Sequence, residues 1–351
     1  LSILQICLKI FRISRDFIRR IGLSVMKVLV TGGLGFIGSN FIIKLLENPK
    51  FEVINVDAEL FGSDHNNLKD FKNFNKYEFV KGNITNRRLM EKLISKVDCV
   101  VNFAAETFVD RSISNSEPFL VSNIRGAYTI LDITKQQEKR FVHISTDEVF
   151  GSLDEGTAIE TTKMNPSNPY AATKASAEFL INSYVNTFDC DALITRCSNN
   201  FGPHQFPEKF IPKCIILATQ EKKIPIYGEG KNIRDWIFVK DHCNAITNVL
   251  LNGKSGESYN ISSDNEISNN KVVETILEIM NKSKDLLEFV EDRPGHDFRY
   301  SINSTKIKNN LNWKPEFKFS DSIELTIKWY QNNKKRWEDL NEKTFDSTPW
   351  K

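Results

Sequence analysis

The sequence predicts an α/β protein, a doubly wound parallel sheet of the Rossmann type with a smaller C-terminal lobe. Short β-rich runs alternate with segments of helical apolar spacing over the first 200 residues, which is typical of parallel strands joined by helices. A glycine-rich segment directly follows the first of these runs. After about residue 200 the alternation loosens, and prolines at 203, 207, 212 and 225 mark loops. These observations favour one large sheet followed by a lobe that closes over a cleft.

Each expected element follows from a local pattern. Strands are predicted at residues 27–31, 53–56, 77–81, 99–103, 140–145 and 192–196, and the last of them closes the series. Helices are predicted at residues 40–46, 87–94, 118–136, 170–187, 211–220, 241–252, 270–281 and 320–332. His143, inside the strand at 140–145, is interpreted as a packed core residue rather than a base.

Composition and charge argue against several functional classes. The chain has 351 residues, of which 40% are hydrophobic and 26% charged, and its formal net charge is +2. These values are typical of a globular protein and give no electrostatic reason to expect nucleic acid as a partner. No segment is long and apolar enough to span a membrane. The six cysteines include no Cys-x-x-Cys pair, so we expect no metal site and a reducing, cytoplasmic location.

Residues 1–25 mix apolar and basic side chains ahead of the first methionine, Met26, which directly precedes the first predicted strand. The basic residues follow the apolar stretch, the reverse of a secretory signal, and no small-residue cleavage site appears. Two interpretations remain, an amphipathic helix lying on a membrane surface or upstream sequence translated from a wrong start. We favour the second and expect a non-native or disordered extension.

The glycine-rich segment carries Gly32, Gly35 and Gly38 between a predicted strand and a predicted helix. Glycines there let the backbone approach a pyrophosphate, whose charge is favoured by the helix N-terminus. Asp57 ends the second strand about twenty residues further on, where an acid accepts hydrogen bonds from ribose hydroxyls and repels a phosphate. Ala58 follows, with no Arg or Lys immediately adjacent. This context predicts NAD rather than NADP as the cofactor.

Two groups of residues predict proton transfer. Tyr170 and Lys174 are spaced to lie on one face of a helix, where the ammonium favours the phenolate and lets the tyrosine act as a base. Thr146, Asp147 and Glu148 end a strand where α/β proteins form their sites, although such residues also form loops and helix caps. One proton-transfer group suffices to oxidise an alcohol. A further acid and base indicate that a group is also eliminated.

Seven segments carry a resemblance to a known family. They are TGGLGFIGSNF (31–41), FAAETFVDRSI (103–113), HISTDEVFG (143–151), NPYAATKASAE (168–178), RCSNNFGPHQFPEKFIP (196–212), PIYGEGKNIRDWIFVKDH (225–242) and RPGHDFRYSIN (293–303). Over about residues 26–332 the chain resembles the extended short-chain dehydrogenase/reductases, the NAD-dependent epimerase/dehydratase family, and within them the dTDP-glucose 4,6-dehydratases. The Thr-Asp-Glu triplet at 146–148 separates such dehydratases from related epimerases and decarboxylases.

The resemblance implies a reaction in which dTDP-glucose becomes dTDP-4-keto-6-deoxyglucose, a step of deoxysugar biosynthesis. Tyr170, assisted by Lys174, would deprotonate the carbon 4 hydroxyl while NAD takes the hydride, with Thr146 holding that oxygen. Glu148 would remove the carbon 5 proton, and Asp147 would protonate the departing carbon 6 hydroxyl. Return of the hydride to carbon 6 would regenerate NAD, which would stay bound. Two adjacent carboxyl groups in different environments can serve as acid and base in this way.

The resemblance also implies binding residues. Cofactor contacts are expected from Gly32, Gly35, Phe36, Ile37, Gly38, Asp57, Asn83, Ile84, Ala104, Ala105, Tyr170, Lys174 and Asn200. Substrate contacts are expected from Thr107, Thr146, Asn199, Lys209, Tyr227, Arg234, Asn269, Arg293 and His296. Arg234 and Arg293 are suited to clamp a diphosphate, because a guanidinium offers two parallel hydrogen bonds to phosphate oxygens. For Arg234 the alternative is an ion pair with Asp235, and Glu208 is interpreted as orienting its loop.

The chain departs from the family at several places. Residues 58–61 read Ala-Glu-Leu-Phe where the family usually has a Lys and a Thr-Tyr pair, Phe108 stands for a frequent His, and Phe150 and Phe201 stand for Tyr. These changes leave the proton-transfer groups untouched but leave the nucleotide base open. The alternative functions are therefore a UDP-glucose 4,6-dehydratase or another sugar-nucleotide epimerase or dehydratase, and more remotely a non-catalytic NAD-binding protein.

The resemblance and the element order divide the chain into three parts. We expect residues 1–25 to be the extension, residues 26–200 the NAD-binding Rossmann domain, and residues 201–340 mainly the lobe that binds the sugar nucleotide. The two long helices near 118–136 and 170–187 resemble the pair that forms the dimer in this superfamily. A homodimer packed through four helices is the expectation, although core packing explains helical amphipathicity equally well.

Overall fold

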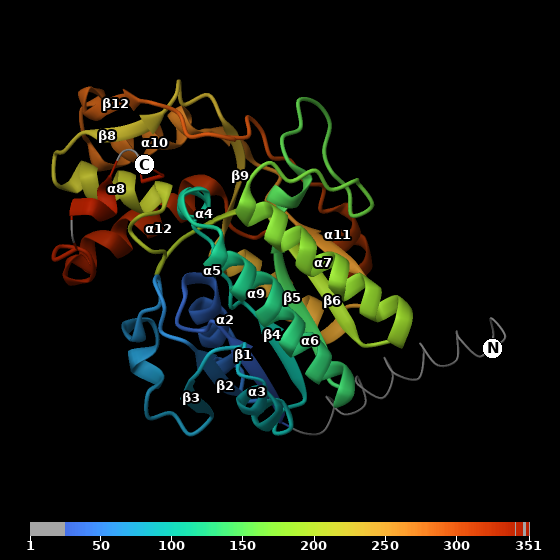
Figure 1. Cartoon of the computed structure of the whole chain (residues 1–351). Coiled ribbons are helices and arrows are strands. Elements are labelled where there is room, and N and C mark those ends of the chain that lie inside the picture. The colour runs from blue at the N-terminus through green and yellow to red at the C-terminus, as the bar shows by residue number, and fades with distance from the viewer. Residues whose placement is uncertain (1–24, 341, 347–348, 351) are drawn as a thin grey trace.

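A computed structural model describes residues 25–340, 342–346 and 349–350 of the chain. The expected N-terminal extension lies outside the described residues, apart from Val25. Within them, a central sheet of parallel strands has the order β10-β6-β5-β4-β1-β2-β3 (Figure 1). Its strands are β1 (Met26–Thr31), β2 (Phe51–Asp57), β3 (Tyr77–Lys81), β4 (Cys99–Asn102), β5 (Arg140–Thr146), β6 (Ala192–Cys197) and β10 (Ser258–Ile261).

Helices cover both faces of this sheet, as its apolar strands require. One face carries α2 (Phe36–Leu46), α9 (Val239–Asn252) and α11 (Thr305–Leu311), and the other carries α3 (Arg87–Ile94), α6 (Ala127–Gln136) and α7 (Pro169–Phe188). Along β1 the side chains alternate between the two cores: Val28 and Val30 pack beneath α2, whereas Leu29 packs on the opposite side. A strand buried on both faces is typical of a parallel sheet.

The smaller lobe has its own core. It combines the sheet of β7 (Asn199–Phe201), β9 (Ile233–Phe238) and β11 (Glu266–Ser268) with the strand pair β8 (Ile224–Tyr227) and β12 (Leu287–Val290). Its helices are α8 (Phe210–Thr219), α10 (Asn269–Met280) and α12 (Phe319–Asn332). Apolar residues of α8, α10 and α12 pack together there, and Figure 1 shows the lobe above the carboxyl ends of the large sheet.

The predicted fold class is confirmed, and most predicted elements lie where the sequence placed them. The long segment at 118–136 is helical from Glu117 to Gln136, but it consists of α5 (Glu117–Phe119), a π-helical stretch at Leu120–Gly126, and α6. A short helix, α4 (Val109–Ser114), precedes it. Among the described helices, none has the length and apolarity needed to cross a membrane.

Two details differ from the sequence-based expectation. Helix α2 begins at Phe36 rather than residue 40, because the glycine-rich turn passes directly into the helix. The strand at Ala192–Cys197 does not close the series, since β10 pairs with it in parallel as a further strand. Helix α9 and strand β10 follow residue 200 yet pack with the large sheet, so the chain returns to that sheet after entering the lobe. The division near residue 200 stays a prediction.

The strand order positions the site. Strand β1 lies between β2 and β4, so the chain leaves neighbouring strand ends in opposite directions at this point. Open α/β sheets form their ligand-binding crevice outside the carboxyl ends of the strands at such a reversal. The glycine-rich turn after β1, the loop after β4 and the end of β5 therefore meet at one edge.

A buried ion pair fastens α7 to the sheet beside this crevice. Glu178 on α7 accepts hydrogen bonds from Arg196 on β6 at 2.6 and 2.9 Å, and the two side chains are 0% and 3% exposed. Arg196 also donates to the backbone oxygen of Glu160 at 3.1 Å. Because both charges are buried and paired, removal of either charge leaves the other without compensation.

We expect Glu178→Gln to lower the free energy of unfolding by about 3–5 kcal/mol, since it leaves the Arg196 charge buried and unpaired. Urea denaturation of the variant and the wild type measures this difference. A matched control is Glu324→Gln, which removes an exposed pair with Lys328 on α12 and should change the free energy by less than about 1 kcal/mol. Equal effects of the two substitutions would contradict the role given to the buried pair.

Candidate active site

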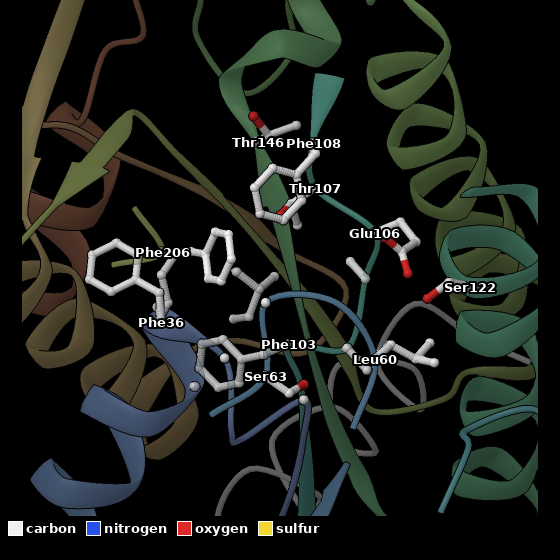
Figure 2. A pocket seen from close by; sticks show the side chains of 18 of the residues that line it. Phe36, Leu60, Ser63, Phe103, Glu106, Thr107, Phe108, Ser122, Thr146 and Phe206 are labelled. Atoms are coloured by element: carbon white, nitrogen blue, oxygen red, sulfur yellow. The ribbon is translucent and has the colours of Figure 1, made fainter. Parts of the chain in front are cut away.

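A cavity at the carboxyl ends of the sheet strands gathers the predicted chemistry. Figure 2 shows side chains from the start of α2, the loop after β2, the loop after β4 and the end of β5 around this one space. The predicted catalytic residues all line it, namely Thr146, Asp147, Glu148, Tyr170 and Lys174. The fold therefore brings together groups that lie far apart in the sequence.

The glycine-rich turn is shaped for close backbone approach. Gly32 has a φ of +68°, and a Cβ atom there would lie 2.7 Å from the backbone of Ala104 in the loop after β4. A Cβ on Gly35 would meet only the Gly32 oxygen, at 3.3 Å, so this residue leaves space above the turn. Gly35 also precedes α2 without a side-chain cap, which leaves the first amides of the helix available to an anion. These features fit a pyrophosphate.

Asp57 organises the second half of this pocket. Its carboxylate accepts hydrogen bonds from the Leu34 amide at 3.0 Å, the Glu59 amide at 2.8 Å and the Ser63 hydroxyl at 2.8 Å. A carboxylate has about four acceptor positions, so one stays available for a ribose hydroxyl. Glu59 lies beside it and pairs with Lys81 and His65. Two neighbouring carboxylates disfavour the additional phosphate of NADP, so the donor set fits NAD.

Every predicted cofactor residue lines the same cavity. Beyond the turn and Asp57, the set comprises Gly38, Phe36, Ile37, Asn83, Ile84, Ala104, Ala105, Tyr170, Lys174 and Asn200. Asn200 Oδ1 accepts a hydrogen bond from His242 Nδ1 at 2.9 Å, which keeps its amide in place behind the pocket. The cavity thus extends from the glycine-rich turn to the proton-transfer groups, which is the span that a dinucleotide needs.

The N-terminal turn of α7 places Tyr170. The Asn168 side chain caps the helix by accepting from the Ala171 amide at 2.9 Å, and Pro169 occupies the first helical position. The Tyr170 ring is buried and contacts Phe119 edge-on, with ring centroids 6.5 Å apart. The predicted spacing of Tyr170 and Lys174 on one helix is confirmed, and both side chains line the cavity.

The expected effect of Lys174 on Tyr170 is not found in the protein alone. Burial raises the pKa of Tyr170 well above its usual value, and the charges of Glu148 and Asp147 raise it further, whereas a hydrogen bond with Thr146 lowers it. Lys174 instead donates to the backbone oxygen of Ile144 at 2.6 Å, and burial lowers its own pKa to about 8. Desolvation therefore outweighs the attraction that the spacing alone suggested.

A chain of buried polar side chains extends from the Lys174 ammonium to β1. This ammonium lies 3.4 Å from His143 Nε2, His143 Nδ1 lies 3.1 Å from the Asn102 amide, and the Thr31 hydroxyl donates to Asn102 at 2.6 Å. Burial lowers the pKa of His143 well below its usual value, and the Lys174 charge adds to this shift. His143 is thus a buried neutral group that positions Lys174, in line with its interpretation as a core residue.

The acid pair at the end of β5 is held by a short turn. Thr146 accepts from the Glu148 amide at 3.3 Å and donates to Asp147 Oδ1 at 3.2 Å, so it caps the turn while also lining the cavity. Burial raises the pKa of Asp147 to about 8, and the neighbouring Glu148 charge contributes to the rise. Asp147 Oδ2 is buried with no hydrogen-bond partner among the described residues. A protonated carboxyl with one free oxygen is suited to donate a proton to a ligand.

The predicted substrate residues fall into two groups. Thr107, Thr146, Asn199 and Lys209 line the cavity, and Lys209 donates to the Thr107 backbone oxygen at 2.8 Å. Tyr227, Arg234, Asn269, Arg293 and His296 do not line it and belong to the lobe. Two residues of the lobe group nevertheless lie near enough to the cavity to interact with its charges, because the charge of Glu148 acts to raise the pKa of both Arg234 and Arg293.

Asp110 joins part of the lobe group to the first half of the chain. It accepts from Arg293 at 3.1 Å and from the Tyr227 hydroxyl at 3.4 Å, and the Tyr227 and His296 rings meet edge-on with centroids 6.3 Å apart. Asn269 starts α10 and donates its backbone amide to the Asn232 oxygen. These contacts place Tyr227, Arg293 and His296 together, and Asn269 is joined to Asn232.

The alternative interpretation of Arg234, an ion pair with Asp235, is wrong. Its guanidinium donates to backbone oxygens of Ile233, Asp297 and Phe298 at 2.7–3.1 Å and lies 4.1 Å above the Tyr300 ring. Asp235 points elsewhere and accepts from Ser198, Ser263 and Asn265. Neighbouring residues on a strand point to opposite faces, which separates these two charges.

Glu208 pairs with Arg111 through two hydrogen bonds of 3.2 and 2.8 Å, and so ties the loop before α8 to α4. The interpretation of Glu208 as a residue that orients its loop agrees with this pairing.

The departures from the family pattern differ in their surroundings. Phe108 lies in the cavity between the rings of Phe61 and Phe206, at 5.0 and 5.8 Å, so an aromatic cluster replaces the usual polar groups there. Phe150 and Phe201 do not line the cavity and pack in apolar cores. A hydroxyl at either of these two positions would need a buried partner, so its absence does not affect the site.

Sequence reasoning missed three residues of the site. Two of them, Tyr300 and Asn168, lie 3.3 Å from Oε2 of Glu148, the proposed base. The third, Asp110 on α4, accepts a hydrogen bond from Arg293 of the lobe. These residues lie inside the quoted motifs, but Tyr300 is 152 positions from Glu148. No local spacing indicates such a contact.

Comparisons with known proteins agree with this geometry. The family model for GDP-mannose 4,6 dehydratase matches residues 29–326. The low-salt glycan biosynthesis protein Agl12 of Haloferax volcanii is 47% identical over 306 residues, which cover 87% of this chain and 98% of that protein.

Two solved structures are similar over nearly the whole chain. The dTDP-glucose 4,6-dehydratase of Bacillus anthracis, solved in complex with NAD, is 43% identical with a TM-score of 0.85, covering 90% of this chain and 100% of that one. DesIV, a dTDP-glucose 4,6-dehydratase of Streptomyces venezuelae solved with NAD and TYD bound, is 38% identical with a TM-score of 0.88 and the same coverage.

The raised pKa of Asp147 makes stability depend on pH. The folded protein keeps the Asp147 proton up to about pH 8, whereas an unfolded carboxyl with a pKa of 3.8 releases it, so folding binds a proton between these values. Stability is therefore lost as the pH rises through this window, by at most about 1.4 kcal/mol per pH unit. Asp147→Asn removes the effect, and we expect its free energy of unfolding relative to wild type to increase from pH 5 to pH 8.

Urea unfolding at several pH values measures the difference, with Glu324→Gln as a control whose difference from wild type stays flat. A flat difference for Asp147→Asn as well would show that Asp147 is already ionised at neutral pH.

Proposed function

Because the chain belongs to the GDP-mannose 4,6-dehydratase family, we propose that it catalyses the NAD-dependent dehydration of dTDP-glucose to dTDP-4-keto-6-deoxyglucose. Two relatives that are 40% identical over 90% and 88% of this chain are named dTDP-glucose 4,6-dehydratases, and two solved enzymes of that name hold NAD. One observation carries the proposal. A buried carboxyl held protonated, Asp147, and a second carboxyl, Glu148, lie beside Tyr170 in a cavity that fits a dinucleotide.

NAD, when bound, supplies a hydride acceptor and donor and brings a positive charge into the cavity, which favours the Tyr170 phenolate. Gly32, Gly35 and the first amides of α2 would hold its pyrophosphate, and Asp57 its ribose. Tyr170 removes the proton from the carbon 4 hydroxyl, and Thr146 donates a hydrogen bond to that oxygen. Lys174, held by the Ile144 oxygen, supports Tyr170 from the same face of α7.

The ketone at carbon 4 acidifies the proton on carbon 5. Glu148 removes that proton, and Asp147 donates its own proton to the departing carbon 6 hydroxyl. The two carboxyl groups can divide these roles because burial keeps Asp147 protonated up to about pH 8. Addition of a hydride at carbon 6, equal to the one lost from carbon 4, and of a proton at carbon 5 would complete the methyl group. The product keeps the nucleotide and gains a keto and a methyl group.

The lobe would hold the nucleotide of the substrate. Arg234 and Arg293 carry buried positive charges that face Glu148, and Arg293 Nε is buried without a hydrogen-bond partner among the described residues. Asn199 Oδ1, at the cavity wall, is likewise buried and unpaired there. Buried polar atoms without partners are rare in proteins, and a diphosphate and a sugar would satisfy them.

We further propose a homodimer formed through α6 and α7. These helices and the π-helical stretch before α6 expose several large apolar side chains, with Phe179 61%, Phe188 47%, Leu120 44% and Tyr128 40% exposed. Exposed apolar side chains concentrated on two neighbouring helices are typical of an interface. A cytoplasmic location is supported by Cys99, Cys190, Cys197, Cys214 and Cys243, which are all free thiols.

The reaction is tested by offering dTDP-glucose and UDP-glucose side by side to the purified protein. We expect the 4-keto-6-deoxy product from dTDP-glucose, detected by the alkali-induced absorbance of the ketosugar. Product from UDP-glucose alone would assign a UDP-glucose 4,6-dehydratase. A change at carbon 4 without loss of the carbon 6 oxygen would assign an epimerase, and no conversion of either sugar would leave a non-catalytic protein.

Glu148→Gln separates the two halves of the reaction. Oxidation at carbon 4 does not need this carboxylate, so we expect reduced cofactor to accumulate while no deoxygenated product forms. The absorbance of reduced nicotinamide in a single turnover measures this. Tyr170→Phe is the matched control, because it should slow the first hydride transfer by a factor of about 10² or more. Full turnover by Glu148→Gln would remove that residue from the mechanism.

A further inference from the structure

A hydrogen-bonded row of side chains leads from Glu148 away from the cavity. The Tyr300 hydroxyl lies 3.3 Å from Glu148 Oε2 and donates to Asp297 Oδ2 at 2.7 Å. The same Asp297 oxygen accepts a hydrogen bond from the Ser167 hydroxyl. The row therefore joins the end of β5 to the segment after β12 and then to the loop before α7.

The side chains of this row become more exposed to solvent from Tyr300 to Ser167. Tyr300 is 2% exposed and Asp297 7% exposed, whereas Ser167 is exposed to solvent. A proton on Glu148 thus has a path of hydrogen-bonding groups to the surface that does not pass through the cavity. The interior members are rigidly held, because Arg234 lies above the Tyr300 ring and donates to the Asp297 backbone oxygen at 2.8 Å.

The same contacts fix the orientation of Glu148. Within the described chain, the Tyr300 hydroxyl and the Asn168 amide both lie 3.3 Å from Oε2 of Glu148. This arrangement makes Oε2 the oxygen that exchanges a proton with Tyr300. Burial and the charge of Glu148 raise the pKa of Tyr300 well above its usual value, and Asp297 adds to this, while Arg234 and Arg293 oppose it. Tyr300 therefore remains a hydroxyl donor rather than a phenolate.

We propose that Tyr300 is a positioning residue that orients Glu148 and exchanges its proton with solvent through Asp297 and Ser167. The inference rests on the proposed dehydration, in which Glu148 takes the carbon 5 proton. No nucleotide or metal is needed for this exchange, and every proton in it moves between groups already in hydrogen-bond contact.

The proton movements balance. After Glu148 takes the carbon 5 proton, its carboxyl donates that proton to the Tyr300 oxygen, while the Tyr300 hydroxyl proton passes to the Asp297 carboxylate. Glu148 is ionised again, Tyr300 is neutral as before, and Asp297 carries the proton. Asp297 releases it at the Ser167 end, and the reverse sequence delivers a solvent proton to carbon 5. Without Tyr300, Glu148 would return the same proton that it removed.

The test is turnover of protiated dTDP-glucose in deuterated water, with the label at carbon 5 of the product read by mass spectrometry and NMR. We expect the wild type to introduce deuterium at carbon 5. Tyr300→Phe should lose most of that deuterium and lower kcat with KM unchanged, and reduced nicotinamide should accumulate because oxidation at carbon 4 continues. Product incubated without enzyme corrects for spontaneous exchange beside the ketone.

Tyr259→Phe is a matched control. Tyr259 is also 2% exposed, and its hydroxyl accepts from the Lys254 amide at 3.0 Å on the far side of the sheet. It should behave as wild type in deuterium uptake. Asp297→Asn tests the row from its other end, because an amide cannot take up the proton, and we expect the same loss of deuterium as for Tyr300→Phe. This second variant keeps the test decisive if the first fails to fold.

The outcomes separate the two proposals. Full deuterium uptake at carbon 5 by either variant overturns the relay and leaves the dehydration standing. A fall of both hydride transfer and elimination in Tyr300→Phe, with deuterium uptake retained, shows a structural role and also overturns it. No ketosugar from the wild type with any tested nucleotide overturns the proposed function and the relay with it.

Discussion

The parallel register of β5 between β4 and β6 is the constraint on which the rest of the site depends. It brings the end of β5, with Asp147 and Glu148, to the same edge of the sheet as the glycine-rich turn after β1 and the loop after β4. Helix α7 begins beside this edge, where Tyr170 lines the cavity, and is fastened to β6 by the buried pair of Glu178 and Arg196. A shift of β5 by one residue would turn the acid pair toward the opposite face, because side chains alternate along a strand.

Burial, rather than pairing of charges, governs the chemistry of the cavity. Desolvation is the largest cause of the pKa shifts of Asp147, Tyr170 and Lys174, and in each case it favours the neutral form. For Asp147 this produces a proton donor near neutral pH. For Tyr170 it raises the pKa well above its usual value, so this residue is a neutral hydroxyl in the protein alone.

The lobe completes a site that the large sheet begins. Arg293 pairs with Asp110 on α4, and Tyr300 reaches Glu148 at the end of β5. Both contacts cross between segments separated by more than a hundred residues, and both involve charged or hydroxyl groups with little exposure. Contacts between the lobe and the sheet therefore hold Glu148, the proposed base, and the first residues of the lobe also form a wall of the cavity.

The sequence by itself determined the fold class and the groups available for chemistry. Alternating β-rich and helical runs predicted the strands and helices closely, since hydrophobic periodicity and turn residues act locally. The glycine-rich turn, Asp57 and the Tyr170–Lys174 spacing were recognisable for the same reason. Local pattern could not show that β10 would rejoin the sheet, because its partner β6 lies about sixty residues earlier and only tertiary packing brings the two together.

Only the tertiary structure decided how these groups behave. The distance of Arg234 from Asp235, the raised pKa of Tyr170 and the contact of Tyr300 with Glu148 all depend on burial and on packing between remote segments. Such effects arise from the three-dimensional environment of a side chain, so no spacing along the chain encodes them. Residue identity supplied two neighbouring carboxyl groups, and desolvation within the folded chain raises the pKa of one of them, Asp147.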